Sequence, residues 1–269
     1  MLDKETKGKF EGLGNHWSAV LDDGDLDLAK VASQIVEAKN STVKKAGNFS
    51  GILSFEGPLK GFALIKINSE NAELWSAYPF LQISNPVSVS VEKIDEWSNG
   101  GEAVIWGSIG PVSVSFFDTL YFCNKGKYKV GEAYTFHLGA IAHSFEKRTQ
   151  DLVIEPTEGP LKGEKLYTQK MTSFMPAHDY GGEFTFICPF VSFSGQDSQF
   201  EESFSIFPYY IMSADTDSAL FTAPMYVNKK LVKGDIQAND SVQGTAWLQG
   251  YLIDSFREDW TVNPESSHA

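Results

Sequence analysis

The segment "GTAWLQGYLID", Gly244–Asp254, is the last apolar, strand-like stretch of the chain. Its tryptophan, Trp247, lies between Gly244 and Gly250. Glycines inside a strand mark bends where a sheet curls sharply. The earlier segment "TFHLGAIA" carries the same interruption at Gly139. The sequence therefore predicts strongly curled strands that recur along the chain.

Two other pairs of segments repeat with nearly the same spacing. "EGPLKG" occurs at Glu56–Gly61 and again at Glu158–Gly163. "FDTLYFCNK" at Phe117–Lys125 aligns with "FTAPMYVNK" at Phe221–Lys229. Similarity at a fixed spacing indicates a duplicated structural unit. The alternative is chance similarity among β-hairpin turns, which share Gly, Pro and Asn.

The repeat predicts two β-modules, 48–151 and 152–254. Apolar and polar residues alternate within them, as in "VSVSVEK" from Val87 and "VSVSFF" from Val112, which is typical of half-buried strands. With short strands, curling glycines and interstrand loops, each module resembles the OB fold, a five-stranded barrel that binds oligonucleotides or oligosaccharides. The resemblance implies an all-β, mostly antiparallel chain with two small barrels, the second a copy of the first.

The two ends of the chain differ from the modules. Within 1–47, the segment "DLDLAKVASQIVEAK" has apolar residues at spacings of three and four, which predicts an amphipathic helix. Asp25 or Asp27 is positioned to cap its start. Residues 255–269 are polar and are expected to form a flexible tail.

The sequence lacks the common catalytic and metal-binding motifs, so we expect no cofactor and no metal. His137 and His143, six residues apart on one strand, lie too far from each other to share an ion. The weak catalytic candidates are His178, Asp179 and Tyr180, an acid/base group beside two glycines on a loop. Ordinary loop composition is the alternative explanation.

Two lysine-rich turns and one tryptophan are the candidate binding residues. The turns "NKGKYKVG" and "NKKLVKG" are suited to single-stranded nucleic acid if they lie beside aromatic side chains, or they protect strand edges from pairing. Trp247 packs in the core, with Gln243 or Gln249 as partner of its indole N–H, or forms a platform for a sugar or a protein. The lysines are Lys125, Lys127, Lys129, Lys229, Lys230 and Lys233.

Charge and cysteine content narrow the class of function. The chain has 22 Lys and Arg against 35 Asp and Glu, a formal net charge of −13, which repels phosphates and anionic membranes. We expect Cys123 and Cys188 to be free thiols in the reducing cytoplasm, although one disulfide is the alternative.

Together these features predict a non-catalytic, acidic binding protein of the inhibitor or immunity type, which engages a protein partner, with a basic protein among the options, and has no membrane association. The alternatives are a single-stranded nucleic-acid binder, and a carbohydrate-binding module or enzyme that uses the loop around His178.

Overall fold

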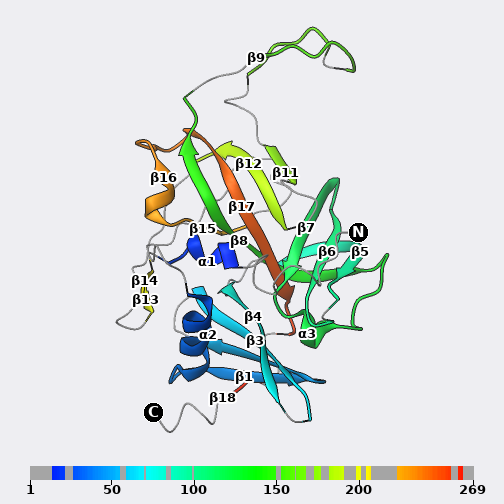
Figure 1. The fold of residues 1–269 in the computed structure, drawn as a ribbon. Coiled ribbons are helices and arrows are strands. Elements are labelled where there is room, and N and C mark those ends of the chain that lie inside the picture. The colour runs from blue at the N-terminus through cyan, green and yellow to red at the C-terminus, as the bar shows by residue number, and fades with distance from the viewer. Residues whose placement is uncertain are drawn as a thin grey trace.

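The computed structural model describes residues 14–21, 27–54, 59–69, 71–82, 86–98, 100–149, 153–160, 162–167, 173–176, 182–190, 198–200, 204–206, 223–255 and 260–262. The predicted all-β class is confirmed, because most of these residues lie in strands and most strand pairs are antiparallel. Figure 1 shows the arrangement, with a blue and cyan sheet below and green and orange strands above. Among the helices in these ranges, none is long and apolar enough to cross a membrane.

The lower layer, here called the N-terminal sheet, is an antiparallel meander. Each strand pairs with the next along the chain, and a short C-terminal strand pairs with the first. The strands are β1 (Thr42–Ala46), β2 (Phe49–Ser54), β3 (Leu59–Ile67), β4 (Ala72–Leu81) and β18 (Thr261–Val262).

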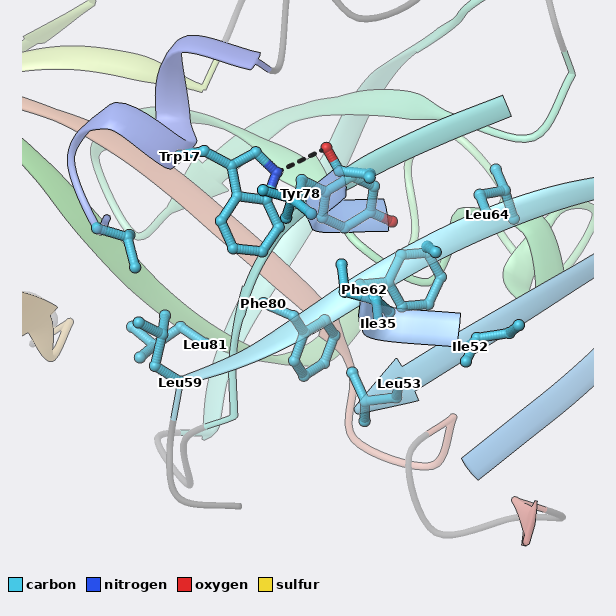
Figure 2. Close-up of a cluster of buried hydrophobic side chains, with 14 of the residues drawn as sticks. Trp17, Ile35, Ile52, Leu53, Leu59, Phe62, Leu64, Tyr78, Phe80 and Leu81 are labelled. Atoms are coloured by element: carbon cyan, nitrogen blue, oxygen red, sulfur yellow. Dashed lines mark hydrogen bonds between the residues drawn. The ribbon is translucent and has the colours of Figure 1, made fainter. Parts of the chain in front are cut away.

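Helix α2 (Leu28–Glu37) covers this sheet and matches the predicted amphipathic helix. The Asp27 carboxylate caps its start by accepting the backbone N–H of Ala29 at 3.0 Å. Val31 and Ile35 are buried in the core that α2 shares with the sheet, whereas Lys30 faces solvent. Figure 2 shows Ile35 beside the aromatic side chains of β3 and β4.

The upper layer contains a ring of five strands, here called the barrel. β5 pairs with β6, β6 with β7, β7 with β17, β17 with β8, and β8 with β5. The β7–β17 pair is parallel, and the other four pairs are antiparallel. The strands are β5 (Pro86–Glu96), β6 (Ala103–Ile109), β7 (Val112–Asp118), β8 (Ala133–Lys147) and β17 (Ser241–Leu252), with helix α3 (Tyr121–Asn124) between β7 and β8.

Two glycines of β17 allow its backbone to lie close to that of β8. A Cβ on Gly244 would lie 2.0 Å from the Ser144 carbonyl oxygen, and one on Gly250 would lie 3.0 Å from that of His137. Both carbonyls belong to β8, which runs antiparallel to β17 along almost its whole length. The close approach of the two backbones therefore requires residues without a side chain.

Further strands extend the barrel sheet beyond the ring. β12 pairs with β17 and β11 with β12, while β15 and β16 run parallel to β8. A hairpin of β9 and β10 projects from the top in Figure 1. The bounds are β9 (Val153–Ile154), β10 (Leu166–Tyr167), β11 (Ser173–Pro176), β12 (Glu183–Pro189), β13 (Ser198–Phe200), β14 (Phe204–Ile206), β15 (Met225–Tyr226), η2 (Lys229–Leu231) and β16 (Val232–Lys233).

The observed strand pairing does not form a separate barrel in each of the two predicted modules. The ring takes β5–β8 from the first predicted module, 48–151, and its fifth strand, β17, from the second, 152–254. β2–β4 of the first module form a separate sheet with β1 and β18, which lie outside both predicted modules. Hydrogen bonds of β17 with β7 and β8 therefore cross the predicted boundary. Whether the two halves arose by duplication stays a prediction.

Side chains join the two layers at the open edge of β4. The Gln249 side chain accepts the Leu81 N–H at 2.9 Å and donates to the Pro79 carbonyl at 3.2 Å. The Trp17 indole N–H donates to the Ala77 carbonyl at 3.1 Å, the dashed line in Figure 2. Gln249 lies on the barrel and Trp17 in helix α1 (Gly14–Ser18). Both layers are therefore connected through β4.

Within the predicted flexible tail, 255–269, the structure describes 255 and 260–262, and these residues belong to the fold. Thr261 and Val262 pair with β1, and the Thr261 hydroxyl donates to the Val43 carbonyl at 3.3 Å. Ser255 is fully buried, and its carbonyl accepts the Lys44 ammonium at 2.7 Å. Polar composition misled the prediction because a two-residue strand at a sheet edge gains its energy from backbone hydrogen bonds.

Ile35→Ala should lower the free energy of unfolding by roughly 2–5 kcal/mol, because it leaves a cavity in a fully buried site under α2. Chemical denaturation measures the change. Ser33→Ala, on the exposed side of the same helix, is the control and should change stability by less than about 0.5 kcal/mol. Equal stability of Ile35→Ala and the parent would mean that the helix does not dock.

Gly244→Ala should lower the free energy of unfolding by about 3 kcal/mol, at the upper end of overpacking costs, because backbone atoms of β8 block the added methyl group. Thermal unfolding followed by circular dichroism provides the measurement. Ser113→Ala, an exposed position on β7, is the matched control. An unchanged melting temperature for Gly244→Ala would contradict the close contact of β17 and β8.

Candidate functional site

The lysines proposed from the sequence do not form one surface. Lys125, Lys127 and Lys129 precede the start of β8, whereas Lys233 pairs beside Glu146 near its end, roughly 40 Å away along the strand. Lys229 and Lys230 lie in η2, close to Lys233 in sequence. Lys125 also forms an ion pair with Glu96 at 2.8 Å. The structure therefore separates the two basic turns.

The other proposed residues have different outcomes. His178, Asp179 and Tyr180 lie outside the described residues. Trp247 is 2% exposed and belongs to the core between the layers. Both glutamines considered as its partners are hydrogen-bonded elsewhere, since Gln243 donates to Glu146 at 2.6 Å and Gln249 bonds β4. Trp247 is therefore no exposed platform, but it supports a cluster that the sequence did not reveal.

That cluster begins with His16 of α1. Its imidazole stacks on the Trp247 indole, with ring centroids 3.8 Å apart and planes inclined by 6°. The neighbouring Trp17 holds α1 to β4 through its indole N–H. His16 is 2% exposed. The short helix thus places one imidazole against the outer side of the barrel.

The second member, His143, lies at an irregularity of β8. Thr245 of β17 pairs with Ser144, but the next residue, Ala246, pairs with Ala142, so His143 is the extra residue of a β-bulge. A bulge re-aims side chains relative to the regular alternation of a strand. The His143 Nε2 atom lies 2.9 Å from Nδ1 of His16.

The third member, Glu183, is the first residue of β12 and lies opposite Trp247 in the β12–β17 pair. Gly182 fixes this position. Its φ of +82° is the left-handed conformation that favours glycine. Its N–H donates to the Ser115 hydroxyl at 3.1 Å, and its carbonyl accepts the Leu248 N–H at 2.6 Å. Hydrogen bonds to the two barrel strands β7 and β17 therefore fix the backbone directly before Glu183.

The His16–His143–Glu183 cluster brings two imidazoles and a carboxylate together. One ligand atom from each lies within 4.8 Å of the others. Burial and the adjacent His143 lower the pKa of His16 well below its usual value, and burial lowers that of His143. Both rings are therefore neutral at pH 7, which is the form that bonds a neighbouring imidazole or a metal ion.

A second feature is the outer side of β5, β6 and β7. Val89 and Val91 point into the barrel, so the alternating Ser88 and Ser90 point outward, and both are exposed. Cross-strand pairing aligns Ser90 with Ser108, and Ser108 with Ser113. The half-exposed Trp106 lies in the next row, with the Lys93 ammonium 5.5 Å from its ring centre. We call Ser88, Ser90, Trp106, Ser108 and Ser113 the open face.

A buried polar network lies at the end of β7. The Asp118 carboxylate accepts the Tyr128 hydroxyl, the Leu120 N–H at 3.0 Å and the Asn124 amide at 3.5 Å. The Ser255 hydroxyl donates in turn to Asn124. Burial raises the pKa of Asp118 to about 6, although these hydrogen bonds oppose the shift. The network ties α3 to the segment after β17.

Sequence reasoning missed the cluster because its members are far apart in the chain. It compared His143 only with His137, which contacts Tyr251 in the structure. His16 is 127 residues from His143, and no local pattern announces the bulge that orients His143. The one available signal was the pair His16–Trp17, because two large side chains that can form hydrogen bonds follow a polar N-terminal stretch there and indicate a buried contact.

Both cysteines are free thiols, Cys123 half-buried and Cys188 buried, in agreement with the preferred expectation.

Searches of protein-family models, curated proteins and solved structures found no match to this chain. Interpretation of the cluster and the open face therefore depends on their own geometry.

Asp118→Asn should remove a pH dependence of stability between about pH 4 and pH 6.5. The folded pKa lies above the unfolded value, so the carboxyl's stabilising contribution is present at low pH and is lost as pH rises through about 6. The free-energy difference between parent and variant should fall by up to about 3 kcal/mol over this range. Urea unfolding of both proteins at several pH values measures it, and parallel curves would contradict the shift.

Proposed function

We infer that this chain is a non-catalytic binding protein that holds a basic protein partner on the open face of an OB-type barrel. The observation that carries this proposal is the order of strands in the ring. In chain order the five strands pair as first, second, third, fifth, fourth and back to first, with a helix between the third and the fourth. That arrangement supports assignment to the OB fold.

The OB assignment directs attention to one surface. Such barrels bind ligands on the face of their second and third strands and on adjacent loops. Here those strands are β6 and β7, which carry Trp106, Ser108 and Ser113 of the open face. Tryptophan is enriched among the residues that dominate protein interfaces. The half-exposed indole has the short side chains of Ser108 and Ser113 in the neighbouring row, which leave room for a partner's side chains, and Lys93 on its other side.

Charge supports a basic protein as the partner. The formal net charge of −13 attracts positively charged surfaces over several ångströms and increases association rates. Single-stranded nucleic acid is less favoured, because the same field repels phosphates and the two lysine turns lie at opposite ends of β8. Free thiols at Cys123 and Cys188 support a reducing compartment, and we propose the cytoplasm.

A carbohydrate is the second candidate, favoured by one observation. The row Ser90–Ser108–Ser113 presents three hydroxyls beside Trp106. Hydroxyls that both donate and accept are suited to sugar hydroxyls, and an indole offers a flat apolar surface to a sugar ring. A neutral glycan would also avoid repulsion by the acidic surface.

Site-specific photocrosslinking in native lysate tests the proposal. A photoreactive residue at Ser88 should capture a basic protein, whereas the same residue at Ser33, on the exposed side of α2, should not. With the captured protein purified, Ser113→Arg should weaken binding at least tenfold, about 1.4 kcal/mol, by repulsion and loss of fit. Ser33→Arg is the matched control and should bind like the parent.

Two outcomes would redirect the interpretation. Equal affinities of Ser113→Arg and the parent for the captured protein would remove the open face as its binding surface. Binding to a glycan array that Trp106→Ala abolishes would favour the carbohydrate candidate instead.

A further inference from the structure

The His16–His143–Glu183 cluster lies outside the open face and serves no role in the proposed partner binding. Its members come from three separate elements, α1, β8 and β12. Two of them lie in special local structure, His143 at a β-bulge and Glu183 directly after a left-handed glycine. Such features need not occur merely to fill a hydrophobic interface, since an apolar side chain would do so without burying polar atoms.

We propose that His16, His143 and Glu183 bind a single zinc ion. Two imidazole nitrogens and one carboxylate oxygen form the three-ligand set of zinc sites that keep a fourth position for water. The three ligand atoms already lie within 4.8 Å of one another. The site is new to this chain and does not depend on what the open face binds.

The geometry requires only small adjustments to accept the ion. A tetrahedral zinc ion with bonds of about 2.1 Å separates its ligand atoms by about 3.4 Å. The two histidine nitrogens, now at 2.9 Å, must move apart by a few tenths of an ångström. The carboxylate oxygen must approach by up to about 1.4 Å, within the reach of a half-buried glutamate side chain.

The surroundings of the cluster favour a bound zinc ion over a hydrogen bond between the two imidazoles alone. One carboxylate leaves a net charge of about +1 on the loaded site, which the acidic protein stabilises. Trp247 fixes the orientation of His16 by stacking, so little conformational freedom is lost on binding. His143 and Glu183 are half-buried, which leaves one side of the cluster accessible.

The ion would also join the two layers of the fold. His16 belongs to α1, which Trp17 bonds to β4 of the N-terminal sheet, while His143 and Glu183 belong to the barrel sheet. Binding to the folded chain alone raises its stability by linkage. Zinc should therefore raise the melting temperature as well as bind.

Calorimetric titration of the EDTA-treated full chain with zinc chloride tests the proposal. We expect one ion per chain with a dissociation constant below about 10 µM, which corresponds to a binding free energy of about −7 kcal/mol. The melting temperature should rise, and cobalt(II) in place of zinc should show the visible absorption of a low-coordinate site. His143→Gln and Glu183→Gln should each weaken zinc binding at least 100-fold. His137→Ala, on the same strand but outside the cluster, should bind like the parent.

Two ligand variants are used so that the test still gives an answer if one of them does not fold. Circular dichroism establishes which variants fold, and Glu183→Gln, at a half-buried position, decides the matter if His143→Gln does not. Zinc binding that survives in a folded ligand variant would overturn the site, and so would a parent that binds no zinc below 100 µM, roughly −5 kcal/mol. Preference for iron(II) over zinc in competition would overturn the assignment of the metal.

Discussion

The open edge of β4 is the constraint on which the two-layer structure depends. Strand edges expose backbone donors and acceptors that must be bonded when they are buried. Here the Gln249 side-chain amide acts as a short stretch of partner strand, because it both accepts from Leu81 and donates to Pro79. Trp17 satisfies the Ala77 carbonyl on the same edge. A buried glutamine that lost either bond would leave unpaired groups in the core, each costing about 1–3 kcal/mol.

This edge also explains why the histidine cluster lies where it does. Trp17 can reach β4 only if α1 lies between the layers, and the adjacent His16 then faces the outer side of β17. Trp247 therefore has two functions, as a core residue beside Phe117 and Tyr78 and as the support of the His16 ring. Its position between the two layers, rather than on the surface, is what makes a buried polar cluster possible there.

The sequence predicted what local patterns determine and missed what long-range contacts determine. The apolar spacing around Ile35 and the cap at Asp27 gave α2, and period-two alternation gave β5 and β7. The glycines of β17 stand where the backbone of β8 comes too close for a side chain, and their association with curling stays a prediction. By contrast, the His16–His143 contact, the bulge at His143 and the pairing of Thr261 with β1 depend on partners more than 100 residues away. No local periodicity carries that information.

The segment Gly244–Asp254 decides the fold because it supplies what the first half of the chain lacks. β5–β8 can form a four-stranded sheet with three adjacent pairs, but β7 and β8 would remain open edges. β17 closes both edges at once, parallel to β7 and antiparallel to β8. Closure removes the edges that otherwise invite aggregation, at the cost of pairing strands separated by about a hundred residues, which slows folding. The same strand carries Gln249 and Trp247, so closing the barrel also creates the surface that holds β4 and His16.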